Sequence, residues 1–273
     1  MKRFYPDPGD DEVIFDEAWE ALDAGEPADC LELLERCHPD EPARYLIACR
    51  AHLDLGEHAE AREALALARR LGVEDDDPDW VAAQGELLLF EWQIEPARAL
   101  FEALVALEPS AYAFDRLALC ADLEDDPLAA DRWLAEAHRV DPELIPPPRH
   151  MSSEEFGRVI EAALTELSAE HRASIESTPI IVEPVPFREL APEGDPLSVP
   201  PDALGMFVGP SLVDEAGGAL GDIPPAIYLF QRNLERVTAD AEELEEEIRT
   251  TLFHEIGHRL GYDESGIDEL GLG

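Results

Sequence analysis

Hydrophobic positions follow a helical period through the first half of the chain and form short continuous runs in the second half. Residues 12–144 are rich in Ala, Leu and Glu and contain almost no strand signals. Short breaks interrupt this helical pattern at 23–27, 54–58, 90–94 and 123–127. Each break is followed by a small residue in a helical run, and these residues are Cys30, Ala61, Ala97 and Ala130. Their spacings of 31, 36 and 33 residues indicate a helical repeat array with two helices per repeat.

Several positions of this array resemble the tetratricopeptide family. The third repeat has Gly85, Ala97, Phe101 and Pro109 at the spacing of that motif, and the fourth has Leu117, Ala118, Ala130, Ala137 and Pro142. Pro42 closes the first repeat, whereas the second repeat departs from the motif with Val73 where proline is expected. Small residues let paired helices approach, and proline stops the second helix. One helix pair cannot bury its apolar face alone, so the repeats must stack.

The resemblance implies an all-α, tetratricopeptide-like array over residues 12–144. Such arrays often offer a concave groove to a peptide or protein, so a protein partner in the helical-repeat groove is one expectation. The alternative is that these helices only pack against the rest of the chain. A Pro-rich linker follows at 145–151, where Pro146 to Pro148 favour an extended spacer.

A second domain, in which helices and strands are mixed, is predicted to begin at Ser152. There SSEE forms a capping box before the helical run FGRVIEAALTEL. Three segments read as strands: TPIIVEPVP at 178–186, LGMFVG at 204–209 and AIYLF at 226–230. We expect a loop between the last two. The strand at 204–209 lies either at an open edge that pairs with an extended substrate or in the centre of the core.

A long amphipathic helix is predicted from Thr238 or Asp240 to a stop at Gly261. Its apolar ridge consists of Leu244, Ile248, Leu252, Ile256 and Leu260, which lie four residues apart. His254 and His258 lie on nearly the opposite side, one turn apart, so both rings project from one face. That spacing lets two imidazole nitrogens reach one metal ion.

The residues around this histidine pair predict a catalytic metal site. Glu255 lies next to His254, which completes an HExxH arrangement with the glutamate as general base. After the turn at Gly261, Glu264 is the expected third ligand, with Asp263 as the alternative. Three protein ligands leave a fourth position for water, as catalytic zinc requires. Imidazole and carboxylate ligands also suit other divalent ions.

Residues 152–273 are similar to the minimal zincin-like metallopeptidases, a small bacterial family. The likeness is carried by the leading helix, by IIVEPVP, LGMFVG and PPAIYLF, and by the helix ending in HEIGH before an acid-rich turn. It implies a small α+β zincin-like domain in which His254 and His258 bind zinc and Glu255 is catalytic. The family often has Asp where Glu264 stands. The expected fold is therefore an all-α repeat array followed by this α+β domain.

Composition limits the partners that the chain can have. It carries 63 Asp and Glu against 20 Lys and Arg, a formal net charge of −43, and Lys2 is its single lysine. So acidic a chain should repel nucleic acid and anionic membranes. The charge fits either a solvated acidic coat or a docking surface for a basic partner. The first residues lack the apolar middle of a signal peptide, and there is no apolar run of eighteen residues, which favours a cytoplasmic protein.

Four cysteines lie in the N-terminal half, at Cys30, Cys37, Cys49 and Cys120, without a CxxC pair. We expect small buried side chains there rather than a zinc knuckle or a disulfide.

These observations favour a zinc-dependent metallopeptidase that hydrolyses peptide bonds, with the repeats recruiting a substrate or partner. Tyr228, Arg232 and Arg259 are candidates for stabilising the oxyanion, although packing and ion pairing would also explain them. One alternative is a protein-interaction scaffold whose metal site is structural or vestigial. Metal-dependent hydrolysis of a bond other than a peptide bond is a further option.

Overall fold

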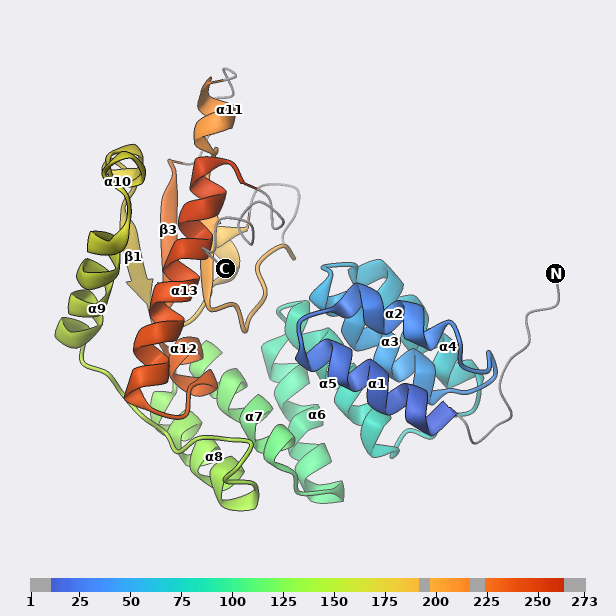
Figure 1. Ribbon diagram of the computed structural model, residues 1–273. Coiled ribbons are helices and arrows are strands. Elements are labelled where there is room, and N and C mark those ends of the chain that lie inside the picture. The colour runs from blue at the N-terminus through green and yellow to red at the C-terminus, as the bar shows by residue number, and fades with distance from the viewer. Residues whose placement is uncertain (1–10, 192–196, 217–223, 263–273) are drawn as a thin grey trace. The chain divides into compact units, whose positions relative to one another are not determined.

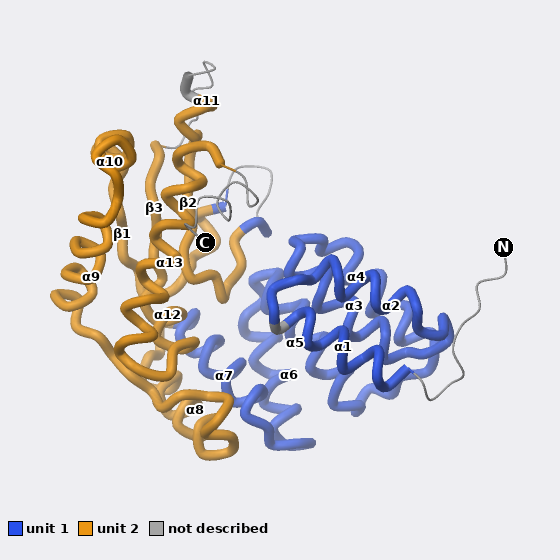
Figure 2. The backbone as a smooth tube through the Cα atoms, in the orientation of Figure 1, with its two compact units in different colours: residues 1–124, 191–198 blue, residues 125–190, 199–273 orange. Residues whose placement is uncertain are grey.

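The computed structural model describes residues 11–191, 197–216 and 224–262. Within them the chain forms two compact units, shown in separate colours in Figure 2. The N-terminal unit comprises residues up to Glu124 together with Ala191–Ser198, and the C-terminal unit comprises Asp125–Leu190 and the residues from Val199. We describe each unit by itself.

The N-terminal unit is a stack of helices, as the repeat pattern predicts. Its helices are α1 (Asp11–Asp23), α2 (Pro27–Leu34), α3 (Ala43–Asp54), α4 (His58–Arg70), α5 (Pro78–Phe90), α6 (Ile94–Leu107) and α7 (Ala111–Leu123). Helices α1 and α2, α3 and α4, and α5 and α6 contact each other as pairs. Figure 1 shows this order. The helix α8 (Pro127–Val140), which the repeat pattern pairs with α7, falls in the C-terminal unit.

Small residues are buried where the repeat pattern places them. Cys30, Ala61, Ala97 and Ala130 are all fully buried. Between α5 and α6, a Cβ atom added at Gly85 would lie 2.7 Å from a ring carbon of Phe101. The packing of this pair therefore requires the absence of a side chain at Gly85, because real Cβ atoms do not approach so closely.

The four breaks share one backbone feature that residue types alone do not show. The third residue of each break has a positive φ angle, at Gly25 (75°), Gly56 (71°), Trp92 (60°) and Asp125 (60°). Glycine adopts this left-handed conformation without steric cost, whereas Trp and Asp do not. The turn within each pair is thus the same in all four repeats, even where its sequence differs.

The C-terminal unit is mixed α and β. In chain order its elements are α8, α9 (Ser153–Glu166), α10 (Ala169–Ile175), β1 (Ile180–Glu183), the short 3-10 helix η1 (Arg188–Leu190), β2 (Gly205–Val208), α11 (Leu212–Ala216), β3 (Ala226–Phe230), α12 (Gln231–Val237) and α13 (Ala241–Leu260). All three strand predictions and the capping box of Ser152 with Glu155 are confirmed. The segment between β2 and β3, expected as loop, contains α11, and helices α10 and α12 were not predicted.

The strands form one sheet in the order β1-β3-β2, with β1 parallel and β2 antiparallel to β3. Met206 lies opposite Tyr228, and Phe207 lies opposite Ile227. In the part of the chain that the structure describes, β2 is therefore an edge strand, and the alternative of a central strand is wrong.

The core of this unit lies between the sheet and helices α9 and α13. Ile227 and Leu229 of β3 pack in one apolar cluster with residues of both helices, which lie on the same side of the sheet in Figure 1. Four of the five ridge residues of α13, Leu244, Ile248, Leu252 and Ile256, are fully buried, and Leu260 packs against the cluster. The helix is nevertheless not simply one-sided, because Thr251, Phe253, Glu255 and Arg259 are buried as well.

The four cysteines are buried free thiols of the N-terminal unit, as predicted. Burial is the main reason that the pKa of Cys30 and Cys37 is raised to about 11 and that of Cys49 and Cys120 to about 12. At neutral pH these side chains are protonated and behave as small apolar groups.

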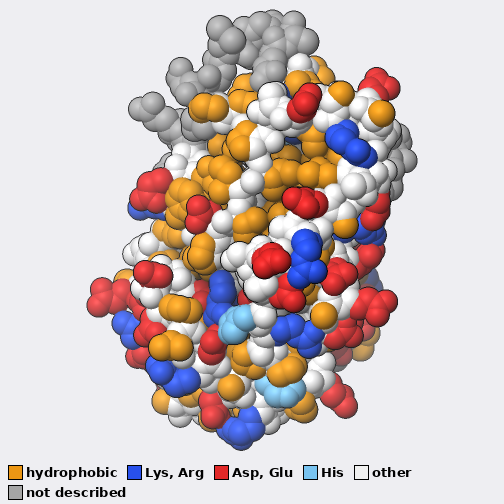
Figure 3. All heavy atoms as spheres, turned by 90° about the vertical axis from the view of Figure 1, so that its left-hand side faces the viewer, with side chains coloured by type: hydrophobic (Ala, Val, Ile, Leu, Met, Phe, Trp, Pro, Cys, Tyr) orange, Lys and Arg blue, Asp and Glu red, His pale blue; other side chains and the backbone are white. Residues whose placement is uncertain are grey.

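On the face drawn in Figure 3, hydrophobic side chains gather in the upper half, and arginines lie among the acidic side chains below. Among the described residues, no helix combines the length and apolar character needed to cross a membrane.

Candidate metal centre

The helix that carries the histidine pair is fixed at both ends by local signals. The Asp240 side chain accepts hydrogen bonds from the N–H groups of Glu242 and Glu243 and so caps the first turn of α13. Gly261 ends the helix in the left-handed conformation, with φ of 94°. A Cβ atom at Gly261 would lie 2.5 Å from Val213 of α11. Both the backbone angle and the packing therefore require glycine at this stop.

The two histidines point their ring nitrogens at each other. The Nε2 atoms of His254 and His258 lie 3.0 Å apart, and the ring planes are nearly perpendicular at 82°. Two nitrogens bound to one tetrahedral zinc ion at 2.0–2.1 Å lie about 3.3 Å apart. The observed separation is a hydrogen-bond distance between the two rings and is close to the separation in a shared metal site, and both side chains are half-buried.

Glu255 is held against the edge strand of the sheet. Its side chain is buried, and its Oε2 atom accepts a hydrogen bond of 2.6 Å from the backbone N–H of Phe207 in β2. The ladder explains why this N–H is available. Along an antiparallel pair, every second residue makes its backbone hydrogen bonds with the neighbouring strand. The N–H of Phe230 donates to the carbonyl of Leu204, so Leu204 and Met206 are the residues of this segment that bond to β3. The backbone groups of Gly205 and Phe207 therefore point to the open edge. The carboxylate therefore lies at that edge, on the residue that follows His254 in α13.

The close approach of α13 to β2 depends on Gly205. A Cβ atom at this position would lie 2.6 Å from Cγ2 of Thr251 and 3.1 Å from Cγ of Glu255. A side chain at Gly205 would thus displace the turn of α13 that carries Glu255. Sequence reasoning used Gly205 only as part of a strand motif and missed this role.

The third ligand cannot be placed. Glu264 and its alternative Asp263 lie outside the described residues. Within the described ranges, no three or more His, Cys, Asp or Glu side chains form a group that could hold a metal ion. The geometry therefore brings together the rings of His254 and His258, and the assignments of Glu255 as catalyst and Glu264 as third ligand stay predictions.

The three oxyanion candidates have structural contacts. Arg259 is buried and donates from Nε to Oγ1 of Thr178 and from Nη1 to the carbonyl of Pro210. Tyr228 packs edge-on against Phe187, with their ring centroids 6.1 Å apart. Arg232 is part of an ion-pair network described next. These contacts agree with the packing and pairing roles that the sequence also allowed.

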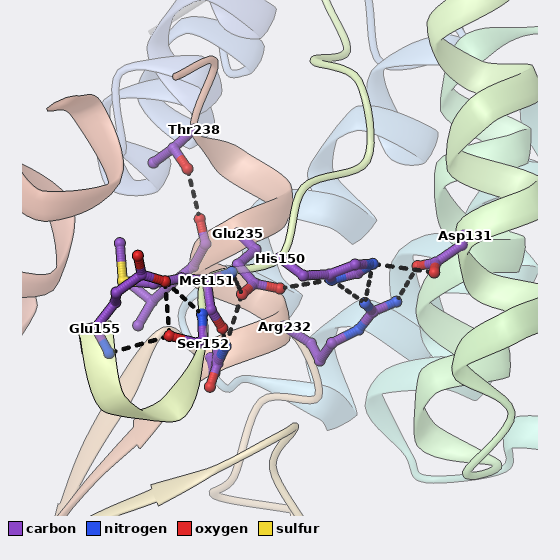
Figure 4. Close-up of polar contacts among 10 residues, drawn as sticks. Asp131, His150, Met151, Ser152, Glu155, Arg232, Glu235 and Thr238 are labelled. Carbon is purple, nitrogen blue, oxygen red and sulfur yellow. Dashed lines mark hydrogen bonds and ion pairs between the residues drawn. The ribbon is translucent and has the colours of Figure 1, made fainter. Parts of the chain in front are cut away.

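A polar network, not expected from the sequence, joins α8, the segment before α9, and α12 (Figure 4). Arg232 donates to Asp131 at 2.8 Å, and His150 Nε2 lies 3.0 Å from the same carboxylate. The buried Glu235 accepts from the N–H of Met151 at 2.8 Å. Asp131 and Arg232 are 101 residues apart, which is why no local pattern reveals them. The network attaches α8 to the unit that contains the histidine pair.

The C-terminal unit also has a crevice of about 670 Å³, but it is not at the histidines. Its walls are formed by α9 and by α13 from Ala241 to Arg249, before the turn that carries His254. The crevice therefore belongs to a different part of the unit from the candidate metal centre.

Comparisons with known proteins find a family model and solved structures that are similar to parts of this chain. Residues 175–273 match the model of a protein family described as zincin-like metallopeptidase. The match starts at the end of α10 and takes in the sheet and α13, so the segment 152–174 lies outside it. No curated protein matches the chain. Among solved structures, the crystal structure of MamA is similar at 19% identity and a TM-score of 0.36, covering 50% of this chain and 81% of that chain.

Proposed function

We propose that this chain, whose residues 175–273 match the zincin-like metallopeptidase model, is a zinc-dependent enzyme that hydrolyses peptide bonds. One observation carries the proposal. The convergent Nε2 atoms of His254 and His258 lie on the same helix as Glu255, a buried carboxylate that is held at an open sheet edge. This arrangement combines a place for a metal ion, a proton acceptor and backbone groups for an extended peptide.

His254 and His258 would hold the metal, with Glu264 or Asp263 as third ligand. When bound, zinc supplies Lewis acidity, which polarises a carbonyl group and makes water nucleophilic near neutral pH. The imidazoles suit zinc as ligands.

Glu255 would act as the general base and acid. Its carboxylate takes a proton from the attacking water and then delivers a proton to the leaving amine. The Phe207 N–H holds Oε2 and so fixes the direction of the carboxylate. Pre-organisation of this kind lowers the cost of reaching the reactive geometry.

The edge strand would bind the substrate by strand addition. The Phe207 N–H is taken by Glu255, but the backbone groups of Gly205 and the carbonyl of Phe207 also point away from β3, where an extended peptide can pair with them. Because backbone groups make these bonds, this part of the recognition is independent of substrate side chains.

The helical array would recruit the substrate or a partner protein. Support comes from a groove of about 560 Å³ on the N-terminal unit, lined by residues of α1, α3, α5 and α7. A cytoplasmic location and the lack of a nucleic-acid partner stay predictions.

Metal analysis and peptide cleavage test this function. The purified chain should bind one zinc per molecule and cleave members of an unstructured peptide library. Glu255→Gln should keep the metal and lower the cleavage rate by a factor of at least about 10³. Glu245→Gln, an exposed position on the same helix, is the matched control and should cleave normally.

A chain that cannot retain zinc after loading would refute the proposal. Zinc bound by both His254 and His258 without turnover of any peptide would instead favour the scaffold function. In that case the capture of a partner should not change in Glu255→Gln.

A further inference from the structure

The groove of the N-terminal unit has one apolar wall. Phe15, Trp19 and Leu22 of α1 face it together with Leu46 and Ile47 of α3. Trp19 is 47% exposed, a large value for so apolar a side chain. This wall can accept aromatic or aliphatic side chains of a bound segment.

The other wall is polar and carries more carboxylates than guanidinium groups. Asp54, Asp79 and Glu86 face the groove with Arg50 and Arg116. Glu86 is buried, accepts from Tyr112 at 2.6 Å and pairs with Arg50 at 3.1 Å. Arg50 is thus engaged by a carboxylate of the groove itself, and Arg116 pairs with Asp115 at 2.6 Å and with Glu86 at 3.7 Å.

Asp79 offers a further carboxylate of this wall to a bound cation. Burial raises the pKa of its carboxyl group, and the charges of Asp77 and Glu108 raise it further. A nearby positive charge would lower the electrostatic cost of ionising Asp79. The groove therefore fits a segment that combines aromatic side chains with cationic ones.

The chain contains such a segment in MKRFY at its N-terminus. Lys2, the single lysine of this acidic chain, stands next to Arg3, Phe4 and Tyr5. We propose that the segment 1–10 docks in the groove of its own chain, with Phe4 and Tyr5 against the apolar wall and Lys2 and Arg3 toward the carboxylates. The inference does not depend on the metal chemistry proposed above.

Chain length permits this docking. Ten residues can extend over about 33 Å, which spans four helices packed 8–10 Å apart. The segment leads directly into α1, whose side chains form part of the apolar wall. In addition, a short tether gives the segment an effective concentration on the order of millimolar at the groove. The segment would then compete with any external ligand of similar chemistry.

A peptide-binding experiment on the full-length chain tests the proposal. The probe is a synthetic peptide of residues 1–10 with a fluorophore at its C-terminal end, followed by anisotropy. In one variant Lys2, Arg3, Phe4 and Tyr5 are all replaced by Ser. This variant should bind the probe with one-to-one saturation and at least about tenfold more tightly than the wild type, whose groove is occupied.

Groove substitutions in the four-serine background show where the probe binds. Trp19→Ala with Asp79→Lys should weaken binding by at least about tenfold, whereas Glu63→Lys, an exposed position on α4, should leave it nearly unchanged. Circular dichroism melting checks that each variant is folded.

Three results would overturn the proposal. The first is equal binding, or no binding, by the wild type and the four-serine variant. The second is a groove variant that binds like Glu63→Lys. The third is a wild-type dimer that becomes monomeric in the four-serine variant, since this would place the segment in the groove of a second copy.

Discussion

Gly205 and Thr251 meet where the edge strand crosses α13: the Cβ position of the glycine lies 2.6 Å from the methyl carbon of the threonine. This contact sets the distance between β2 and the helix turn that carries Glu255. The approach of the two elements, rather than the HExxH spacing alone, brings the carboxylate to the edge.

Gly205→Ala should push α13 away from β2. We expect a loss of about 1–3 kcal/mol in the free energy of unfolding and a cleavage rate that falls more than metal affinity does, because both histidines stay on one helix. Thr251→Ser removes the methyl group that the new Cβ meets. The double variant should therefore recover at least about 0.5 kcal/mol relative to the sum of the single changes. Strict additivity in urea denaturation would contradict this coupling.

Asp131 should make the attachment of α8 dependent on pH. Burial alone would raise the pKa of this carboxyl group, but hydrogen bonding and the charge of Arg232, helped by His150, lower it below its ordinary value. The ionised form therefore stabilises the fold above pH ~4, and this contribution is lost as the pH falls through the lowered pKa.

Asp131→Asn should accordingly reduce the local stability of α8 by about 0.5–1.5 kcal/mol at pH 6, measured by amide hydrogen exchange as protection factors. The difference from the wild type should shrink toward pH 3. Asp76→Asn, at an exposed position of the N-terminal unit, serves as the control. A difference for Asp131→Asn that stays constant from pH 6 to pH 3 would count against the charged pairing.

The thiols should be inert in the folded chain. With the pKa of Cys30 and Cys37 raised to about 11 by burial, only about one thiol in a thousand is ionised at pH 8, and Cys49 and Cys120 are raised further. An aromatic disulfide reagent should therefore react slowly with the native chain and with all four thiols in guanidinium chloride. Rapid reaction of one equivalent with the native chain would show that one of the sites is accessible.

Two glycines with open surroundings should respond oppositely to alanine. Neither Gly56 nor Gly157 has an atom within 4 Å of an added Cβ, but φ is +71° at Gly56, whereas Gly157 lies within α9. Gly56→Ala should destabilise the chain by about 1–2 kcal/mol, and Gly157→Ala should stabilise it by about 0.5–1 kcal/mol. Thermal unfolding of the two variants measures both effects, and a shift in the same direction would contradict the backbone argument.

Local signals in the sequence were sufficient to predict helix α13 and the placement of its two histidines on one face. Asp240, the apolar ridge and Gly261 act within a few residues of the elements that they define, so a helix with His254 and His258 on one face could be predicted. Helix α12 could not be predicted in this way, because it follows β3 directly and its N-cap residue Phe230 makes no side-chain capping hydrogen bond. By contrast, Ser168 does cap α10, and this signal was overlooked.

The contacts that give the site its form are not local. Glu255 and Phe207 are 48 residues apart, and their hydrogen bond depends on which strand lies at the sheet edge. Sequence periodicity identifies a strand but not its neighbours, so it left the position of β2 open. The same limit applies to Arg232, whose partner lies on a helix that the repeat pattern assigned to the array.

The connection that contains the left-handed residue has a constant length in every repeat, whereas the connection between successive repeats varies in length. Each pair is joined by three residues, at 24–26, 55–57, 91–93 and 124–126, whereas successive pairs are joined by segments of different length, at 35–42, 71–77 and 108–110. The connections thus differ in length only between pairs. A positive φ angle at the middle residue marks the turn within each pair, at Trp92 and Asp125 as well as at the two glycines, and new loops grafted onto this scaffold belong at the between-pair junctions.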